Sequence, residues 1–186
     1  MELLTFKATH TRPNAMTILE TNRLTLHHLS LDDAPFMVEL LNDPAWLQYI
    51  GDRNVKTLDQ ARFYLENGPL KSYRDLGFGP YLVRLKENNM PIGTCGLLKR
   101  DVLPAPDIGY AFMPDHRGKG YALEAAQGTL LYGRETLGMH TVYAYTTPNN
   151  EKSGKLLEKL GFTFERIFHW PETAEALKLY KSTTSA

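Results

Sequence analysis

The stretch that decides the fold of this chain is PDHRGKGYALEAA, which runs from Pro114 to Ala126. The apolar and aromatic run 108–113 before it is typical of a β-strand, and apolar residues after Gly120 recur at helical spacing. The stretch therefore predicts a strand, a tight glycine loop and a helix. Such a loop directs unpaired backbone N–H groups, and the positive end of a helix dipole, toward one point. That point suits an anion, most often the phosphate of a nucleotide-type cofactor.

Two well-known phosphate loops do not match this stretch. A Walker A loop requires Ser or Thr after Gly-Lys, whereas Gly118-Lys119 is followed by Gly120. A dinucleotide fingerprint requires Gly or Ala at the position of Leu123 and an acid at the end of the next strand, and the run 141–146 ends without one. Taken alone, the Gly-x-Gly pattern is also compatible with a plain strand-to-helix turn that has a basic rim.

A known family matches better. Residues 107–125 resemble the central strand, pyrophosphate loop and helix of the GNAT superfamily of acetyl-coenzyme A-dependent N-acetyltransferases. Residues 148–162 resemble its Asn-x-x-Ser helix, which ends in Glu-Lys-Leu-Gly-Phe. Residues 19–26 and 41–44 resemble the opening of the ribosomal-protein (alanine) N-acetyltransferase-like branch. The three matches occur in order, and together they are far more specific than any one of them.

The chain has 186 residues, which suits one domain with a sizeable core. We expect residues 1–16 to be an N-terminal extension, which could be disordered, and 17–186 to be a single N-acetyltransferase domain. The resemblance implies an α/β (mixed α+β) GNAT fold: one mixed, mostly antiparallel twisted sheet of about seven strands, splayed at the centre, with about four helices on both faces. The patterns predict strands at 18–29, 80–86, 90–99, 108–113, 141–146, 162–168 and 176–181, and helices at 30–41, 57–67, 120–136 and 150–160.

Composition excludes several classes of protein. Basic and acidic residues both number 21, so the formal charge is zero and nothing suggests a nucleic-acid binder. The single Cys95 cannot form an internal disulfide, and its apolar surroundings indicate a core residue. No run is long and apolar enough for a membrane span or a signal core, so we expect a cytoplasmic protein. His27 and His28 lack further ligands at metal-binding spacing, so no metal is expected.

The resemblance implies acetyl-coenzyme A as cosubstrate. Its pantetheine arm would lie in the gap between the strand ending near Met113 and the strand 141–146, where it would pair with backbone groups as a missing strand would. Its diphosphate would meet the loop amides. The cofactor-binding residues implied in this way are Phe112, Met113, His116, Arg117, Gly118, Lys119, Gly120, Tyr121, Ala122, Asn150 and Ser153.

Acetyl transfer needs a donor for the oxyanion and a proton for the departing thiolate. The resemblance makes a backbone N–H near Met113 the candidate oxyanion donor. Many family members carry a tyrosine four residues before the Gly-Phe pair, where this chain has Leu157. Ser153, Tyr143 or Tyr145 could substitute, or the thiolate could leave unassisted because thiols are fairly acidic.

Asp107 is the best candidate general base, because family members often place an acid on this central strand. A solvated turn residue after Pro106 is its structural alternative. His116 has a suitable pKa for a base, but its place in the loop favours phosphate contact or plain exposure.

The free energy needed to deprotonate the acceptor amine limits which amines are suitable. Neutralising a lysine side chain at pH 7 costs about 4.6 kcal/mol, whereas an α-amine costs about 1.4 kcal/mol. A protein N-terminal α-amine is therefore our leading hypothesis, with a small-molecule amine (antibiotic, amino sugar or polyamine) or a non-catalytic acyl-coenzyme A-binding module as alternatives. The segment 46–76 should border the acceptor pocket, and the protein should be a monomer or homodimer.

Overall fold

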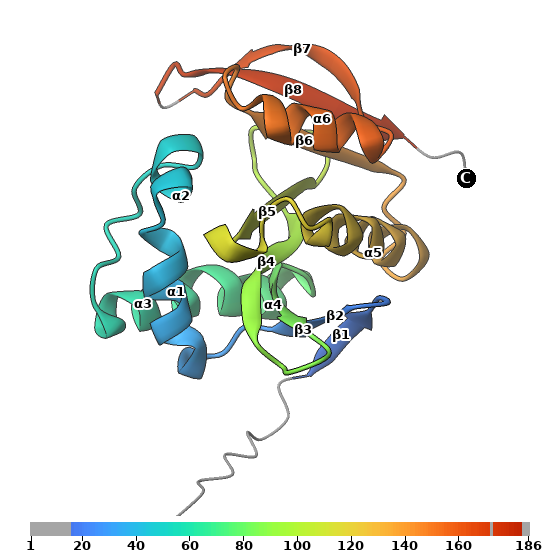
Figure 1. Cartoon of the computed structure of the whole chain (residues 1–186). Coiled ribbons are helices and arrows are strands. Elements are labelled where there is room, and N and C mark those ends of the chain that lie inside the picture. Colours follow the sequence, from blue (N-terminus) through green and yellow to red (C-terminus); the bar gives the residue numbers. More distant parts are fainter. Residues whose placement is uncertain (1–15, 172, 184–186) are drawn as a thin grey trace, which may run out of the picture.

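Alternating apolar residues build one eight-stranded mixed sheet, with helices on both of its faces (Figure 1). The computed structural model describes residues 16–171 and 173–183. The strand order is β1-β2-β3-β4-β5-β6-β8-β7, and only the β5–β6 pair is parallel. The strands are β1 (Thr17–Glu20), β2 (Leu24–His28), β3 (Pro80–Leu85), β4 (Pro91–Leu98), β5 (Asp107–Phe112), β6 (Thr141–Thr146), β7 (Thr163–His169) and β8 (Ala176–Thr183).

The helices are α1 (Ala34–Leu41), α2 (Pro44–Tyr49), α3 (Leu58–Leu65), α4 (Lys71–Leu76), α5 (Tyr121–Glu135) and α6 (Glu151–Lys159). Short 3-10 turns lie at η1 (Leu31–Asp33) and η3 (Pro114–His116), and the π-helical turn η2 (Glu66–Leu70) joins α3 to α4. The fold predicted from the sequence is confirmed in class, sheet type and helix placement. The expected extension 1–16 falls outside the described residues except for Met16.

Local chemistry explains where the element count differs from the prediction. The first expected strand is two strands, because the amide of Thr21 donates to the carbonyl of Leu24 (2.9 Å) and closes a tight turn between β1 and β2. Asp43-Pro44 follows closely on the helix predicted at 30–41. It also begins α2, since the Asp43 carboxylate accepts from the amides of Ala45 and Trp46, and proline fits a first helical turn.

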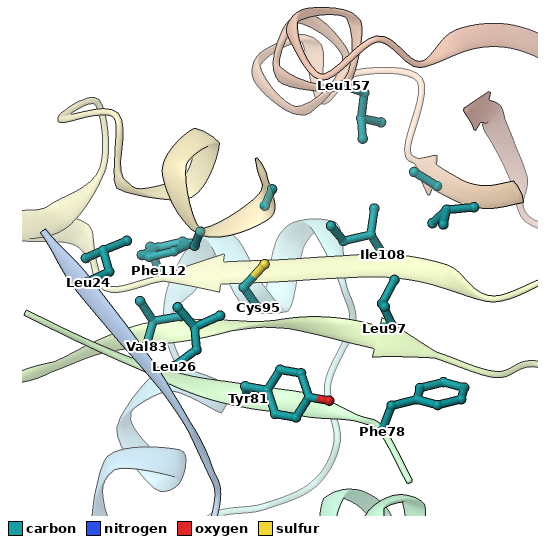
Figure 2. Close-up of a cluster of buried hydrophobic side chains, with 14 of the residues drawn as sticks. Leu24, Leu26, Phe78, Tyr81, Val83, Cys95, Leu97, Ile108, Phe112 and Leu157 are labelled. Atoms are coloured by element: carbon teal, nitrogen blue, oxygen red, sulfur yellow. The ribbon is translucent and has the colours of Figure 1, made fainter. Parts of the chain in front are cut away.

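The two faces of the sheet carry separate cores. On one face, strand residues such as Tyr81, Cys95 and Phe112 pack against α5 and α6, and Leu157 points from α6 into this cluster (Figure 2). On the other face, α1 and α3 pack on Leu82 of β3, with Ala111 of β5 and the adjacent Met113. Cys95 is fully buried, as the sequence indicates.

The sheet opens between β5 and β6. These strands share one pair of partnered residues, Asp107 and Tyr143, whereas β6 and β8 are paired over six residues. The strands β6–β8 with α6 therefore diverge from the rest of the molecule (Figure 1). This confirms the expected central splay. No helix among the described residues is long and apolar enough to cross a membrane.

Candidate active site

The glycine loop sits directly beyond the open end of β5. Gly118 and Gly120 have φ values of +73° and +82°, a left-handed conformation that other residues rarely adopt. Within residues 16–171 and 173–183, no hydrogen bond is donated by the amides of Gly118, Lys119 and Gly120. The first helical amides of α5 are unpaired by geometry, because the first bond of the helix runs from the amide of Glu124 to the carbonyl of Gly120. The loop therefore presents a continuous set of donors to an anion.

Two arginines fix the loop from outside. The Nε of Arg117 donates to the carbonyl of Phe112 (2.8 Å), and its terminal nitrogen pairs with the buried carboxylate of Asp43. The sequence assigned Arg117 to the anion; in the structure its charge is already engaged by α2. Arg23, which the sequence analysis missed, donates to the carbonyl of Lys119 (3.1 Å) and pairs with Glu124 (2.7 Å).

The Arg23 guanidinium also lies over the ring of Tyr121, 4.4 Å from its centroid. Burial would raise the pKa of Glu124, but hydrogen bonds from Thr21 and Arg23 hold it below its ordinary value. Glu124 therefore stays ionised and keeps Arg23 beside the loop. Little in the sequence indicates that Arg23 contacts the loop, because it lies about a hundred residues from its partners.

His116 lies at the end of η3 with its ring 6.3 Å from that of Tyr121. Its Nδ1 is buried and has no hydrogen-bond partner among the described residues. An unpaired buried nitrogen in the loop is consistent with a ligand contact.

The backbone of β5 narrows the choice of oxyanion donor, which the sequence placed near Met113. The amide of Met113 donates to the carbonyl of Ile92 on β4 (2.9 Å), so it is not available to a ligand. Successive amides of a strand point to opposite sides, and the amides of Tyr110 and Phe112 therefore face β6. Because β6 has already diverged at that height, these two amides face the opening rather than a partner strand. They replace Met113 as the candidate oxyanion and pantetheine donors.

Ser153 lies where the two halves of the sheet face each other. Its hydroxyl is 2.9 Å from the Tyr110 hydroxyl, so a hydrogen bond joins β5 to α6 across the opening. The side chain of Asn150 caps α6 by accepting from the amide of Ser153 (3.2 Å). Burial raises the pKa of Tyr110 to about 12, although the bond to Ser153 lowers it somewhat. Tyr110 lies in the predicted strand 108–113, but the sequence did not single it out. Its side chain is on the same face of β5 as that of Phe112, which is the face that α6 covers.

Two other candidates for the proton donor occupy different places. Tyr143 is buried and packs with Leu103 and Leu179, which suits a structural role better than proton transfer. Leu157 is also buried in the core beneath α6, so the structure offers no polar group at that position. Tyr145 packs against the same cluster as Tyr143, and the guanidinium carbon of Arg100 is 5.3 Å from its ring centroid.

Asp107 lies at the closed end of the opening, paired in the sheet with Tyr143. Its side chain is 2% exposed, and the Nε of Arg100 donates to both carboxylate oxygens, at 3.0 and 3.3 Å. Burial raises the pKa of Asp107 above its ordinary value, and the Arg100 charge only partly offsets this. The alternative of a solvated turn residue is therefore wrong.

A cavity of about 510 Å³ borders the segment expected to meet the acceptor. Its wall is formed by the loop before α3, by α3 and by the π-helical turn, and includes Arg53, Phe63, Tyr64 and Gly68. Tyr73 does not take part, since it is packed against His28 with ring centroids 4.0 Å apart. Among the described residues, no cluster of three or more His, Cys, Asp or Glu side chains could hold a metal ion.

These features together fit a coenzyme A thioester. Free amides lie both at the glycine loop and along the last residues of β5, in the order that a diphosphate and an extended arm would meet. A Cβ built on Gly118 would meet nothing within 4 Å, so the loop is open on its ligand side.

The comparison with protein families is decisive. Residues 23–163 match the family model described as an acetyltransferase (GNAT) domain. The chain belongs to the GNAT acetyltransferase family. It is 32% identical over 165 residues to the uncharacterized N-acetyltransferase p20 of Bacillus licheniformis, a match that covers 86% of this chain and 90% of that protein. The chain is thus an N-acetyltransferase of the GNAT type.

Solved acetyltransferase structures match most of the chain. The acetyltransferase from Agrobacterium tumefaciens has a TM-score of 0.76 and 26% identity, and the match covers 99% of each chain. The ribosomal-protein α-N-acetyltransferase RimL in complex with coenzyme A has a TM-score of 0.77 at 18% identity, covering 90% of this chain and 98% of that chain. The second likeness supports the GNAT fold alone.

Proposed function

We propose that this GNAT enzyme transfers the acetyl group of acetyl-coenzyme A to an α-amine, of the kind found at a protein N-terminus, by direct attack in a ternary complex. The observation that carries the proposal is the opening between β5 and β6, which leaves the amides of Tyr110 and Phe112 facing a space that leads to the glycine loop. A thioester held along β5 would present its carbonyl to these amides.

The reaction follows from the groups around this opening. The amine lone pair attacks the thioester carbonyl carbon, and the resulting oxyanion accepts a hydrogen bond from a β5 amide, a contribution of about 3 kcal/mol to the transition state. Asp107 receives the amine proton. Each of its oxygens accepts from Arg100 but retains a further lone pair.

The carbon–sulfur bond then breaks, and the thiolate leaves beside Tyr110 and Ser153. This hydroxyl pair replaces the tyrosine that many relatives carry where this chain has Leu157. Because burial keeps Tyr110 protonated, it can donate a hydrogen bond to the departing sulfur through or beside Ser153. Positioning accounts for much of the remaining acceleration.

Sequence relatives are named for different acceptors. The ribosomal protein uS5-alanine N-acetyltransferase of Escherichia coli is 36% identical over 58 residues, or 31% of this chain and 30% of that protein. The spermidine N(1)-acetyltransferase of Vibrio cholerae is 26% identical over 145 residues, or 77% of this chain and 81% of that protein. An α-amine is favoured here because its neutral form is accessible near pH 7 with one buried carboxylate as base.

An acceptor screen tests the proposal. The purified protein is given acetyl-coenzyme A with peptides that have a free N-terminus, the same peptides with a blocked N-terminus and one internal lysine, and spermidine. Release of coenzyme A thiol and the mass of the product are followed. We expect acetylation of free N-termini; a preference for the lysine peptides or for spermidine would contradict the α-amine assignment.

Two alternatives remain open for the screen. A small-molecule amine (an antibiotic or amino sugar) would show turnover only with that class. A non-catalytic acyl-coenzyme A-binding module would bind acetyl-coenzyme A by calorimetry without thiol release, and the absence of a polar group at Leu157 is the observation that favours it.

A further inference from the structure

We infer that the acceptor carries a carboxylate close to its reactive α-amine, and that Arg100, with Arg53 beyond it, binds this carboxylate. The inference rests on the proposed function, because it specifies the amine that this site acetylates. The first support is the way in which Arg100 is held. Its Nε is committed to the buried carboxylate of Asp107, and its guanidinium carbon lies 5.3 Å and 5.6 Å from the ring centroids of Tyr145 and Trp170.

This arrangement leaves the outer half of the guanidinium available. Among the described residues, neither terminal nitrogen of Arg100 has a hydrogen-bond partner, and the side chain is 26% exposed. An arginine with a fixed plane and free terminal N–H groups is suited to bind a carboxylate through two parallel hydrogen bonds. The side chain is ordered before the ligand arrives, so little rotamer entropy is lost on binding.

A second arginine extends the same cationic surface. Arg53 lines the 510 Å³ cavity together with Tyr64 and forms no hydrogen bond or ion pair with another described residue. Burial raises the pKa of Tyr64 and raises that of Tyr145 to about 12, and the charges of both Arg53 and Arg100 oppose the rise at each hydroxyl. Tyr64 lines the cavity with Arg53, and Tyr145 lies against Arg100, so each arginine has a buried tyrosine beside it.

Negative groups around these side chains are already paired or exposed. Asp107 forms an ion pair with Arg100, and Asp59 on the cavity wall forms one with Arg62 (3.0 Å). Glu175 has an exposed side chain, and its charge shifts the pKa of Tyr145 less than that of either arginine. Arg53 thus remains uncompensated, which disfavours a polyamine and favours an anionic acceptor.

The position of the Arg100 guanidinium limits the distance between the amine and the carboxylate of the acceptor. Arg100 touches Asp107, our candidate base, so a carboxylate on the terminal nitrogens lies within a few bonds of an amine whose proton passes to Asp107. The shared chemistry is that of a free α-amino acid or of a peptide whose first residue is acidic. The aromatic rings of Tyr64, Tyr145 and Trp170 would cover the remaining apolar part of such an acceptor.

Matched acceptor pairs test the inference. One arm compares free amino acids with their amides, for example alanine with alaninamide; the other compares peptides that begin with Asp with the same peptides beginning with Asn. We expect kcat/KM to favour the acid member by about tenfold or more in one arm, which identifies the source of the carboxylate. The amine of alaninamide loses its proton more easily than that of alanine. A higher kcat/KM for alanine would therefore reflect binding of the carboxylate and not the reactivity of the amine.

Two variants locate the effect. Arg53→Gln should raise KM for the acid member and reduce the preference by about threefold to tenfold, with little change in kcat. Arg100→Lys retains a cation for Asp107 but loses the planar fork, and should abolish the preference. Arg134→Gln, an exposed arginine of α5 paired only with Glu135, is the charge-matched control and should leave the preference unchanged.

The same pairs are titrated calorimetrically into the coenzyme A-bound protein, so that binding is measured without turnover. If acid and amide members are bound and acetylated equally in both arms, the inference is wrong, while acetyl transfer itself is unaffected. An unchanged preference in Arg53→Gln and Arg100→Lys would also overturn it. Failure of acetyl-coenzyme A to bind would instead reject the proposed function.

Discussion

The coenzyme side and the acceptor side of the candidate active site use different chemical groups. The proposed coenzyme side consists of backbone amides from one continuous segment, β5 to the start of α5, and its glycines set their direction. The proposed acceptor side consists of side chains from segments far apart in the sequence, such as Arg53, Arg100 and Trp170. A ligand that all relatives share can be bound by main chain, whereas the ligand that differs between relatives is bound by residues that can change without altering the fold.

The comparison predicts the largest loss on the coenzyme side. Gly120→Asp places a Cβ and a negative charge where φ is +82° and the loop amides converge. Loss of about three charge-assisted hydrogen bonds should weaken coenzyme A binding by about 1,000-fold. Calorimetry measures the affinity, and circular dichroism the fold. Gly138→Asp is the control, because Gly138 has a φ of +67° and open surroundings but lies beyond α5; equal losses in both variants would show that backbone strain, not phosphate binding, is responsible.

The junction of the two sides comes next. Asp107→Asn should lower kcat/KM by about 100-fold at pH 7 if Asp107 is the base. Burial raises the pKa of Asp107, so wild-type activity should be lost as pH falls through that raised value and be present above it. At high pH the amine loses its proton to solvent, and the deficit of the variant should shrink. A deficit of the same size at pH 7 and pH 9.5 would mean that Asp107 only positions Arg100.

The same raised pKa has a consequence for stability. The folded state holds the Asp107 proton more tightly than the unfolded chain does, so the favourable contribution exists below the unfolded pKa and is lost as pH rises through the folded pKa. Asp107→Asn should remove this pH dependence from the free energy of unfolding. Urea titrations at pH 4 and pH 7 measure it.

A smaller effect is expected where β5 meets α6. Tyr110→Phe and Ser153→Ala should each lower kcat by about tenfold, with KM for acetyl-coenzyme A nearly unchanged. Since the two hydroxyls share one hydrogen bond, the double variant should lose little more than either single one. Tyr180→Phe, which removes a hydroxyl from neighbouring β8, is the matched control. Additive losses, or equal losses in the control, would show that the two hydroxyls do not act together.

The smallest loss of coenzyme A binding is expected from the ion pair between Asp43 at the start of α2 and Arg117 of the glycine loop. Asp43→Asn keeps an N-cap for α2 but removes the charge that pairs with Arg117, whose side chain is 40% exposed. We expect a loss of about 1 kcal/mol or less in the free energy of unfolding and about threefold weaker coenzyme A binding. Asp43→Ala should cost about 1 kcal/mol more, because the cap is lost as well. If the two variants unfold identically, the cap does not contribute.

The sequence predicted the parts of the molecule that depend on neighbours in the chain. The strand, glycine loop and helix around Gly120 appear where the local pattern placed them, and so does the splay beside it. The sequence placed the oxyanion donor near Met113 but not at a particular amide, since which amide of a strand faces the opening depends on the register with β4. Register is set by pairing across the sheet and is not visible in β5 itself.

The side-chain pairs of the candidate site could not be derived in the same way. Asp107 was chosen from its strand, but its bond to Arg100 depends on how the turn between β4 and β5 folds back. Arg23 and Glu124 meet across a hundred residues, and Tyr110 and Ser153 meet only because α6 packs over β5. No periodicity in a single sequence encodes such pairs, because each depends on tertiary packing.

The single ladder position between β5 and β6 has a mechanical consequence. The first five strands and the last three are joined at this place by one residue pair, so the free protein should tolerate small separations of the two halves without unfolding either. An extended acyl carrier inserted along β5 would bind only while the halves are correctly spaced. Occupancy should therefore slow deuterium uptake across β6 and β8 as well as at the loop, so that the substrate itself completes the cooperative unit.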